Sequence, residues 1–149
     1  MESNTKDREL SISRTLNAPI DLVWEVFANP EHIMQWWGPD GFTNSLNIMD
    51  FAAGGEWKFI MHGPDGTDYP NRSVFKEIVP MEKIIFEHFD PNIMFTITFK
   101  EQGDQTLLNW HMLFDTADIL AMLVKSNNAA EGLKQNIAKL EAYLAARKG

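Results

Sequence analysis

The chain has 149 residues, which is the size of one domain with a single hydrophobic core. Its 13 Lys and Arg against 21 Asp and Glu give a net charge of -8, which argues against a surface that binds nucleic-acid phosphates or an anionic membrane. Because there is no cysteine, disulfides, thiolate catalysis and cysteine-ligated metals are excluded.

The N-terminal residues are polar and lack the apolar segment of a signal peptide. We therefore expect a disordered tail over residues 1–8, a single domain over residues 9–147, and a cytoplasmic protein without membrane insertion. Residues 9–16 alternate between apolar and polar side chains, as in a half-buried strand. Arg14 falls on the apolar side of this strand, where its guanidinium either pairs with an acid or reaches solvent.

Two short helices are predicted after the first strand. Pro19 suits a helix start, and Asn29-Pro30 ends that helix and opens a second one over about residues 31–36. From residue 44 onward, alternating side chains separated by turn residues predict an antiparallel meander of hairpins. The six predicted strands are residues 44–49, 55–62, 71–79, 83–90, 93–102 and 105–114.

The C-terminal segment from Thr116 to Arg147 carries apolar side chains at helical spacing. The stripe consists of Ile119, Met122, Ser126, Ala130, Leu133, Ile137, Leu140 and Leu144. Thr116 suits an N-cap, and Asn127-Asn128 predicts a break before a final helix over about residues 129–146. Because this is the only long amphipathic element, we expect the sheet to curve around it, which gives an α+β fold.

The ordered motifs of the whole domain resemble the SRPBCC (START/Bet v 1-like) superfamily, and specifically its Aha1-like (activator of Hsp90 ATPase homologue 1-like) family. The residues that carry the resemblance include Arg14 to Pro19, Gln35-Trp-Trp-Gly-Pro39, Gly54-Gly-Glu-Trp-Lys-Phe59, Gly63-Pro-Asp-Gly66, Glu77 to Pro80 and Glu131-Gly-Leu133. The resemblance implies a helix-grip fold, in which a curved antiparallel sheet of six to seven strands wraps around the C-terminal helix and encloses an apolar cavity. Two departures are Asn128, where relatives often have Gly, and His88, where relatives often have an aromatic residue.

Metal, cofactor and serine-nucleophile sites lack their usual sequence signals. The four histidines show no HxxxH or HExxH spacing, and Gly54-Gly55 precedes a strand rather than opening a helix, so we expect neither a metal nor a cofactor. The glycine pair instead predicts a bend with close backbone approach. No G-x-S-x-G elbow is present, and Ser45 and Ser73 have no acid or base nearby in the sequence, which argues against a catalytic triad.

His88 is the strongest single candidate for chemistry, because alternation places it with Phe86 on the apolar side of its strand. A carboxylate such as Asp50 or Glu77 would be its partner in general acid–base catalysis. The alternative is a hydrogen-bonded histidine in the wall of the core. Trp36-Trp37 likewise has two interpretations, a lid near a cavity mouth or a plug that fills the core.

Eight Met, ten Phe and five Trp provide more apolar surface than one helix stripe covers, and this surplus predicts a ligand cavity. The alternative is a close-packed core. The predicted lining consists of Trp37, Trp57, Phe59, Met61, Phe75, Phe86, His88, Phe95, Trp110, Met112, Met122, Leu133 and Ile137.

Three functions follow from these expectations. The first is binding of a small hydrophobic or amphipathic molecule of the lipid, polyketide or aromatic class. The second is an enzyme of cyclase, dehydratase or hydrolase type that uses His88. The third, by family analogy alone, is an interaction module for an Hsp90-type chaperone. Independently of function, a homodimer would form through an exposed strand edge or helix face.

Overall fold

Seven strands form one antiparallel sheet in the computed structural model, which describes residues 8–89, 92–127 and 129–148. The strands are β1 (Glu9–Leu16), β2 (Thr43–Met49), β3 (Glu56–His62), β4 (Asp68–Val79), β5 (Lys83–Phe89), β6 (Ile93–Gln102) and β7 (Gln105–Phe114). Their order is β1-β7-β6-β5-β4-β3-β2, so six strands follow one another as a meander and β1 pairs with β7. The predicted antiparallel meander is confirmed.

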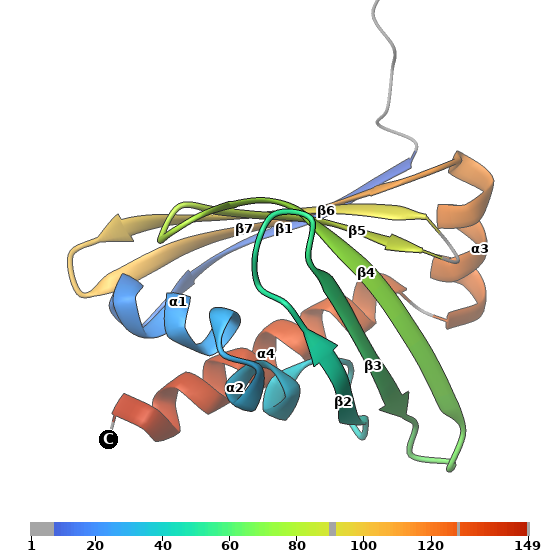
Figure 1. Cartoon of the computed structure of the whole chain (residues 1–149), viewed down its shortest axis with the longest axis horizontal. Helices are drawn as coiled ribbons and strands as arrows, with labels where there is room; N and C mark the ends of the chain where they lie inside the picture. Colours follow the sequence, from blue (N-terminus) through green and yellow to red (C-terminus); the bar gives the residue numbers. More distant parts are fainter. Residues whose placement is uncertain (1–7, 90–91, 128, 149) are drawn as a thin grey trace, which may run out of the picture.

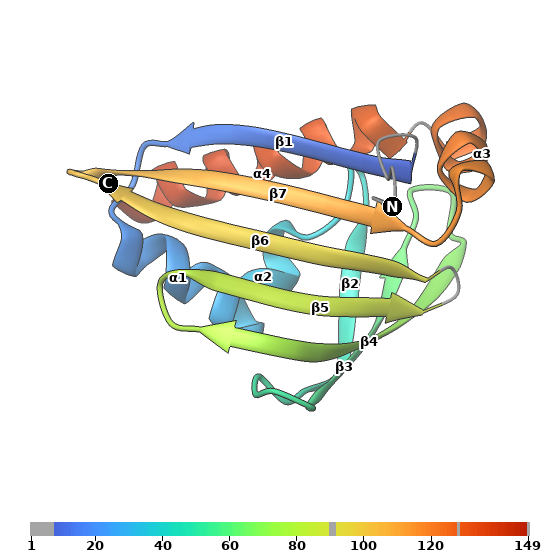
Figure 2. The same ribbon diagram turned by 90° about the horizontal axis from the view of Figure 1, so that it is seen from above.

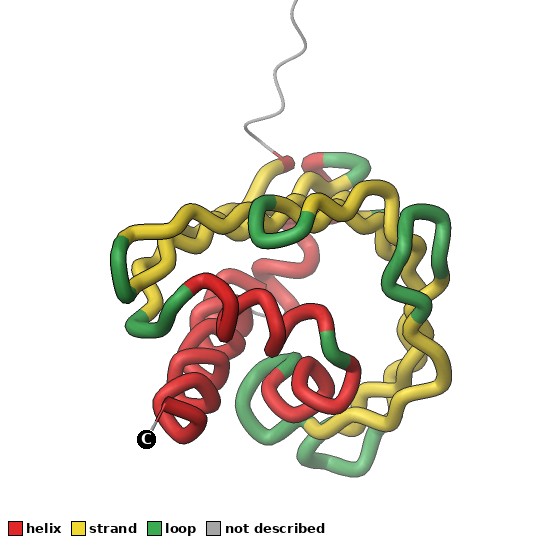
Figure 3. Tube along the Cα trace, turned by 60° about the vertical axis from the view of Figure 1, so that its left-hand side comes forward, coloured by secondary structure: helices red, strands yellow, loops and turns green. Residues whose placement is uncertain are grey.

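Four helices accompany the sheet: α1 (Ile20–Ala28), α2 (Pro30–Trp36), α3 (Ala117–Asn127) and α4 (Ala129–Lys148). Figure 1 shows α1, α2 and α4 on one side of the sheet, and Figure 3 shows the strands following an arc around these helices. α3 lies apart from them, at the end of the sheet where β7 finishes (Figure 2). This arrangement confirms an α+β helix-grip fold with two short helices after the first strand.

The helix boundaries follow from local capping. The Asn29 side chain accepts a hydrogen bond from the Glu31 N–H at 2.9 Å, and Pro30 occupies the first turn of α2, where its missing N–H costs nothing. The Thr116 hydroxyl accepts from the Ile119 N–H at 3.1 Å, which confirms the predicted N-cap of α3. The predicted break is also confirmed because α3 ends at Asn127 and α4 begins at Ala129, whereas Asn128 itself lies outside the described residues.

The apolar stripe is confirmed on α4 and corrected on α3. Leu133, Ile137, Leu140 and Leu144 of α4 are buried in the core. On α3, Ile119 faces inward as predicted, but Met122 is 57% exposed and the other inward positions are Leu120 and Leu123. The side chain of Ser126 lies outside the described part of the structure. Because α3 is a separate helix with its own orientation, a stripe drawn through the break does not set its inward face (Figure 1).

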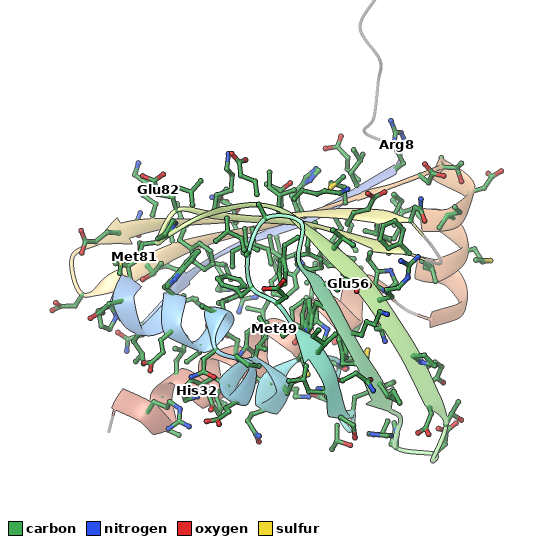
Figure 4. The ribbon with its side chains drawn as sticks, viewed as in Figure 1. Arg8, His32, Met49, Glu56, Met81 and Glu82 are labelled. Atoms are coloured by element: carbon green, nitrogen blue, oxygen red, sulfur yellow. The ribbon has the colours of Figure 1, made fainter. Side chains whose placement is uncertain are left out.

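Side chains in and beside β1 form an ion pair with α4 and a hydrogen bond with the end of β7. The Arg14 guanidinium forms an ion pair with Glu141 of α4 at 3.0 Å, so the guanidinium on the apolar side of the strand has an acidic partner. Both side chains are more than one third exposed, and such a pair stabilises the fold by about 0.5 kcal/mol. Arg8, at the start of the described chain, donates to the Phe114 carbonyl at 2.8 Å (Figure 4). The rest of the predicted tail lies outside the described residues.

The glycine pair before β3 makes the predicted close approach. Gly54 has a φ of +86°, and its N–H donates to the Phe75 carbonyl at 2.7 Å. A Cβ at Gly55 would lie 2.0 Å from the Asp50 carbonyl oxygen, a distance at which no side chain fits. The bend interpretation is therefore confirmed.

Candidate functional site

The concave face of the sheet carries rows of aromatic side chains. Residues paired across antiparallel strands share a face, and the register pairs Phe75 with Phe86 and Phe86 with Phe95 on β4, β5 and β6. The Phe86 and Phe95 rings stack with centroids 4.4 Å apart, and the Trp57 ring lies 5.4 Å from Phe86. Figure 4 shows side chains occupying the space between this face and the helices.

Trp37 enters this aromatic face from the helix side, where it follows α2. Its ring centroid lies 5.0 Å from that of Trp57 and 5.3 Å from that of Trp110, with which it stacks. Trp36 is buried as well, and its indole N–H donates to the Val26 carbonyl at 3.1 Å. Of the two interpretations of the paired tryptophans, the structure supports a plug that fills the core.

The segment that carries Trp37 is held to α4 by polar contacts. The Gly38 N–H donates to the buried amide oxygen of Asn136 at 3.0 Å, and the Lys139 ammonium donates to the Pro39 carbonyl at 3.2 Å. Burial lowers the pKa of Lys139, and the negative charge of Asp40 opposes this shift. α4 therefore fixes the position from which Trp37 reaches the sheet.

Most of the predicted lining residues lie in the core. The buried ones are Trp37, Trp57, Phe59, Phe75, Phe86, Phe95, Trp110, Leu133 and Ile137. Met61, His88 and Met112 are half-buried, and they lie toward the end of the sheet at which β3, β5 and β7 finish. Met122 is the exception, because it is exposed on α3.

A short row of side chains that includes polar residues crosses the aromatic face near the end of the sheet at which β3, β5 and β7 finish. The register pairs Trp57 with Ser73 and Ser73 with His88, so the three side chains share the concave face. His88 Nε2 lies 2.8 Å from the Asn71 amide oxygen, and the Asn71 amide nitrogen donates to the Tyr69 carbonyl at 2.8 Å. Because the Tyr69 contact fixes the orientation of the amide, His88 Nε2 is the donor in its contact with Asn71.

Three polar atoms on the concave face have no hydrogen-bond partner among the described residues: Trp57 Nε1, Ser73 Oγ and Trp110 Nε1. Each belongs to a side chain that is 1% exposed. A buried polar group without a partner destabilises the fold by about 1–3 kcal/mol. The concave face therefore combines apolar ring surface with buried polar atoms that have no partner among the described residues.

The three catalytic candidates do not converge in this structure. A register shift between Phe75 and Glu77 pairs Glu77 with Ile85, which places Glu77 on the outer face, opposite to His88. There Glu77 forms an ion pair with Lys83 at 2.8 Å. Asp50 is exposed in the loop between β2 and β3. His88 Nε2 donates to an amide oxygen and not to a carboxylate, which supports a wall histidine more than a catalytic base.

Each of the four histidines makes a polar contact. His32 Nδ1 lies 2.7 Å from the Tyr143 hydroxyl, and His111 pairs with Glu9, in addition to the contacts of His62 and His88. Within the described residues, no group of three or more His, Asp or Glu is arranged to hold a metal ion.

A hollow of about 760 Å³ opens beside β3 and β4 and is lined mainly by outer-face side chains, although Phe59 of the predicted cavity lining also borders it. Its lining residues are Asn47, Lys58, Phe59, Ile60, Pro70, Asn71, Arg72, Phe89 and Asn92. Ser45, His62 and Asp68 lie beside it and are joined by hydrogen bonds. The sequence places no acid or base near Ser45, whereas the fold brings both to it from other strands. The three residues come from three strands, so their spacing in the sequence does not predict the contact. Alternation predicts only that all three side chains lie on the outer face.

Residues 17–145 match the model of the family described as activator of Hsp90 ATPase homolog 1-like protein. The chain belongs to this family. The AHSA1-like match covers β2 to β7, the helices α1, α2 and α3 and most of α4, and it confirms the family resemblance of the sequence motifs. No curated protein matches this sequence.

Solved structures share the fold of this AHSA1-like chain. A protein from Arthrobacter aurescens aligns with a TM-score of 0.89 at 20% identity, over 97% of this chain and 90% of its own. A protein from Nitrosomonas europaea aligns with a TM-score of 0.87 at 24% identity, over 96% of this chain and 97% of its own. An AHSA1-like protein from Aeromonas hydrophila reaches 0.73 at 18% identity, over 90% and 92%. None of the helices in the described part of the chain is long and apolar enough to cross a membrane.

Proposed function

We propose that this AHSA1-like domain binds a small amphipathic molecule between the concave face of the sheet and α4. The observation that carries the proposal is the presence of three buried polar atoms without partners, on Trp57, Ser73 and Trp110, within an aromatic surface. The apolar body of the ligand would lie against the rings. An oxygen atom of the ligand would accept the indole N–H bonds that the protein leaves unused.

The polar lining selects the chemical class of the ligand. Two indole N–H groups donate only, whereas the Ser73 hydroxyl both donates and accepts. The cross-strand pair Trp57–Ser73 therefore suits a carbonyl, ether or hydroxyl oxygen. A carboxylate is disfavoured at this point because the adjoining side chains are aromatic rings, and burial of an unpaired charge is costly. Oxygenated aromatic or polyketide-like molecules fit this surface better than fatty acids.

Trp37 is the side chain that the ligand must accommodate. Its ring contacts the Trp57 and Trp110 rings, so it lies next to both unused indole donors. A ligand would either stack beside Trp37 or displace its ring from the concave face. The half-buried side chains of Met61, His88 and Met112 mark the end of the sheet from which such a molecule would approach.

The proposal is tested by native mass spectrometry of the purified protein, followed by titration with oxygenated aromatic, polyketide and fatty-acid probes. We expect a 1:1 complex with a neutral oxygenated aromatic probe and quenching of tryptophan fluorescence on binding. If no probe binds, and the protein instead stimulates the ATPase of a purified Hsp90, the chaperone function suggested by the family name replaces ligand binding. Conversion of a bound probe, lost in His88→Ala, would favour the enzyme alternative.

A further inference from the structure

Three side chains on the outer face of the sheet form a hydrogen-bonded relay. The Ser45 hydroxyl lies 2.6 Å from His62 Nε2, and His62 Nδ1 lies 2.7 Å from a carboxylate oxygen of Asp68. The residues come from β2, β3 and β4, and the register pairs His62 directly with Asp68. Ser45 pairs with Ile60, two residues before His62, so its side chain lies diagonally across from the imidazole on the same face.

The chemistry of the three groups fixes the direction of this relay. A carboxylate only accepts hydrogen bonds, so Nδ1 of His62 carries the proton that bonds to Asp68. The lone pair of Nε2 is then left to accept from the Ser45 hydroxyl. Both distances lie in the range of about 2.6–3.2 Å that joins a nucleophile to its base and the base to the group that orients it.

We propose that Ser45, His62 and Asp68 form a hydrolytic site in which Ser45 is the nucleophile, His62 the general base and Asp68 the positioning residue. This site is distinct from the concave ligand surface, because all three side chains lie on the opposite face of the sheet. The relay and the adjoining hollow share Ile60, which pairs with Ser45 and lines the hollow.

The hollow beside the relay indicates the class of substrate. Its apolar lining includes Ile60, Pro70 and Phe89, and its cations are Lys58 and Arg72. The Arg72 guanidinium carbon lies 4.4 Å above the Phe89 ring, and none of the ion pairs in the described part of the chain includes Arg72. Lys58 pairs with Arg72 across β3 and β4, and Ile60 pairs with Pro70 in the same way. The two pairs are two residues apart along the strands, which is a distance of about 7 Å.

An ester of a short dicarboxylic acid fits this distance. Its free carboxylate would bind Arg72 and Lys58, and its ester carbonyl would lie near Ser45. Asn47, two residues after Ser45 on β2, lines the same hollow and offers a side-chain N–H to the carbonyl oxygen. A protein of net charge -8 repels anions, so Arg72, which none of the ion pairs in the described part of the chain includes, favours an anionic substrate. Lys58 forms an ion pair with Glu56 at 3.4 Å and would exchange that partner for the substrate carboxylate.

The reaction balances with the residues present and water. Ser45 Oγ attacks the ester carbonyl carbon as its proton passes to His62 Nε2, and the new C–O bond forms while the C=O π electrons move onto the carbonyl oxygen; their return re-forms the C=O bond. The bond to the leaving alcohol then breaks, and the alcohol departs with the proton from His62. Water, deprotonated by His62, cleaves the acyl-Ser45 ester and releases the acid, which restores the Ser45 hydroxyl.

Covalent labelling tests the nucleophile directly. We expect a fluorophosphonate probe to add one equivalent to the full-length protein, with the adduct mapped to Ser45 by peptide mass spectrometry. Ser45→Ala and His62→Gln should abolish labelling, and Asp68→Asn should slow it by about 10-fold or more. The matched control is Ser13→Ala, another exposed outer-face serine, whose hydroxyl bonds to Asn109 instead of a histidine. An adduct on any other residue, or no adduct, would show that the relay only ties the strands together.

Hydrolysis of model esters tests the anion preference. We expect p-nitrophenyl hemisuccinate to be cleaved with a higher kcat/KM than p-nitrophenyl acetate, and Arg72→Gln to raise KM for the hemisuccinate alone. Ser45→Ala should reduce both rates to that of the buffer while leaving circular dichroism and Tm unchanged. Equal rates for Ser45→Ala and the wild type would overturn the proposal.

Discussion

Replacement of Ser73 by alanine separates the stability of the concave face from its binding function. The Ser73 side chain is 1% exposed, and its hydroxyl has no partner among the described residues. Burial of an unpaired hydroxyl costs about 1–3 kcal/mol, and its removal leaves a void of only one oxygen atom. Ser73→Ala should therefore leave the ligand-free protein as stable as the wild type or more stable by about 1 kcal/mol, which raises Tm by about 3 °C.

The same substitution should weaken ligand binding, because the hydroxyl is one of the groups proposed to contact the ligand. Loss of one neutral hydrogen bond of about 1 kcal/mol raises Kd about 5-fold. Differential scanning calorimetry measures the first effect, and tryptophan-quenching titrations measure the second. Ser11→Ala, an exposed outer-face serine of β1, is the matched control and should change neither quantity. A Ser73→Ala protein that loses stability and binds as tightly as the wild type would refute the reasoning.

Three further experiments test the core packing, the glycine bend and the ion pair between β1 and α4. Trp37→Ala should cost about 3–5 kcal/mol in urea unfolding, because it empties the centre of the aromatic cluster, and a cost below 1 kcal/mol would mean that Trp37 is not a plug. Gly55→Ala should destabilise the protein by more than about 2 kcal/mol, since its Cβ would overlap the Asp50 carbonyl. Gly132→Ala, which has no positive φ and whose Cβ would make only ordinary contact with Pro39 at 3.6 Å, is the matched control. A double-mutant cycle of Arg14→Gln and Glu141→Gln should give a coupling of about 0.2–1 kcal/mol that falls with added salt, and a coupling unaffected by salt would contradict an ionic origin.

The strands and caps could be predicted because their signals are local. Alternation over residues 93–102 and 105–114 located β6 and β7, and the side-chain chemistry of Thr116 located the start of α3. The helical stripe of the C-terminal segment also predicted that the sheet curves around it, and the family motifs implied the same helix-grip arrangement.

The site required information that local patterns do not contain. Simple alternation from Phe75 places Glu77 on the concave face, and only the register shift between them turns Glu77 outward. The contacts among Ser45, His62 and Asp68 depend on the register of three strands, in which a shift of one residue would move a side chain to the opposite face. The inward face of α3 depends on how that helix is oriented relative to α4, which follows the break.

The indole N–H signals of the tryptophans provide the most direct measurement of ligand binding on the concave face. In ¹H–¹⁵N NMR spectra, titration with an oxygenated aromatic probe should shift the Trp57 and Trp110 side-chain signals downfield as they gain an acceptor. The Trp36 signal is the internal control, because its N–H already donates to the Val26 carbonyl at 3.1 Å and should stay in place. Unchanged Trp57 and Trp110 signals at saturating probe would contradict ligand binding at this surface.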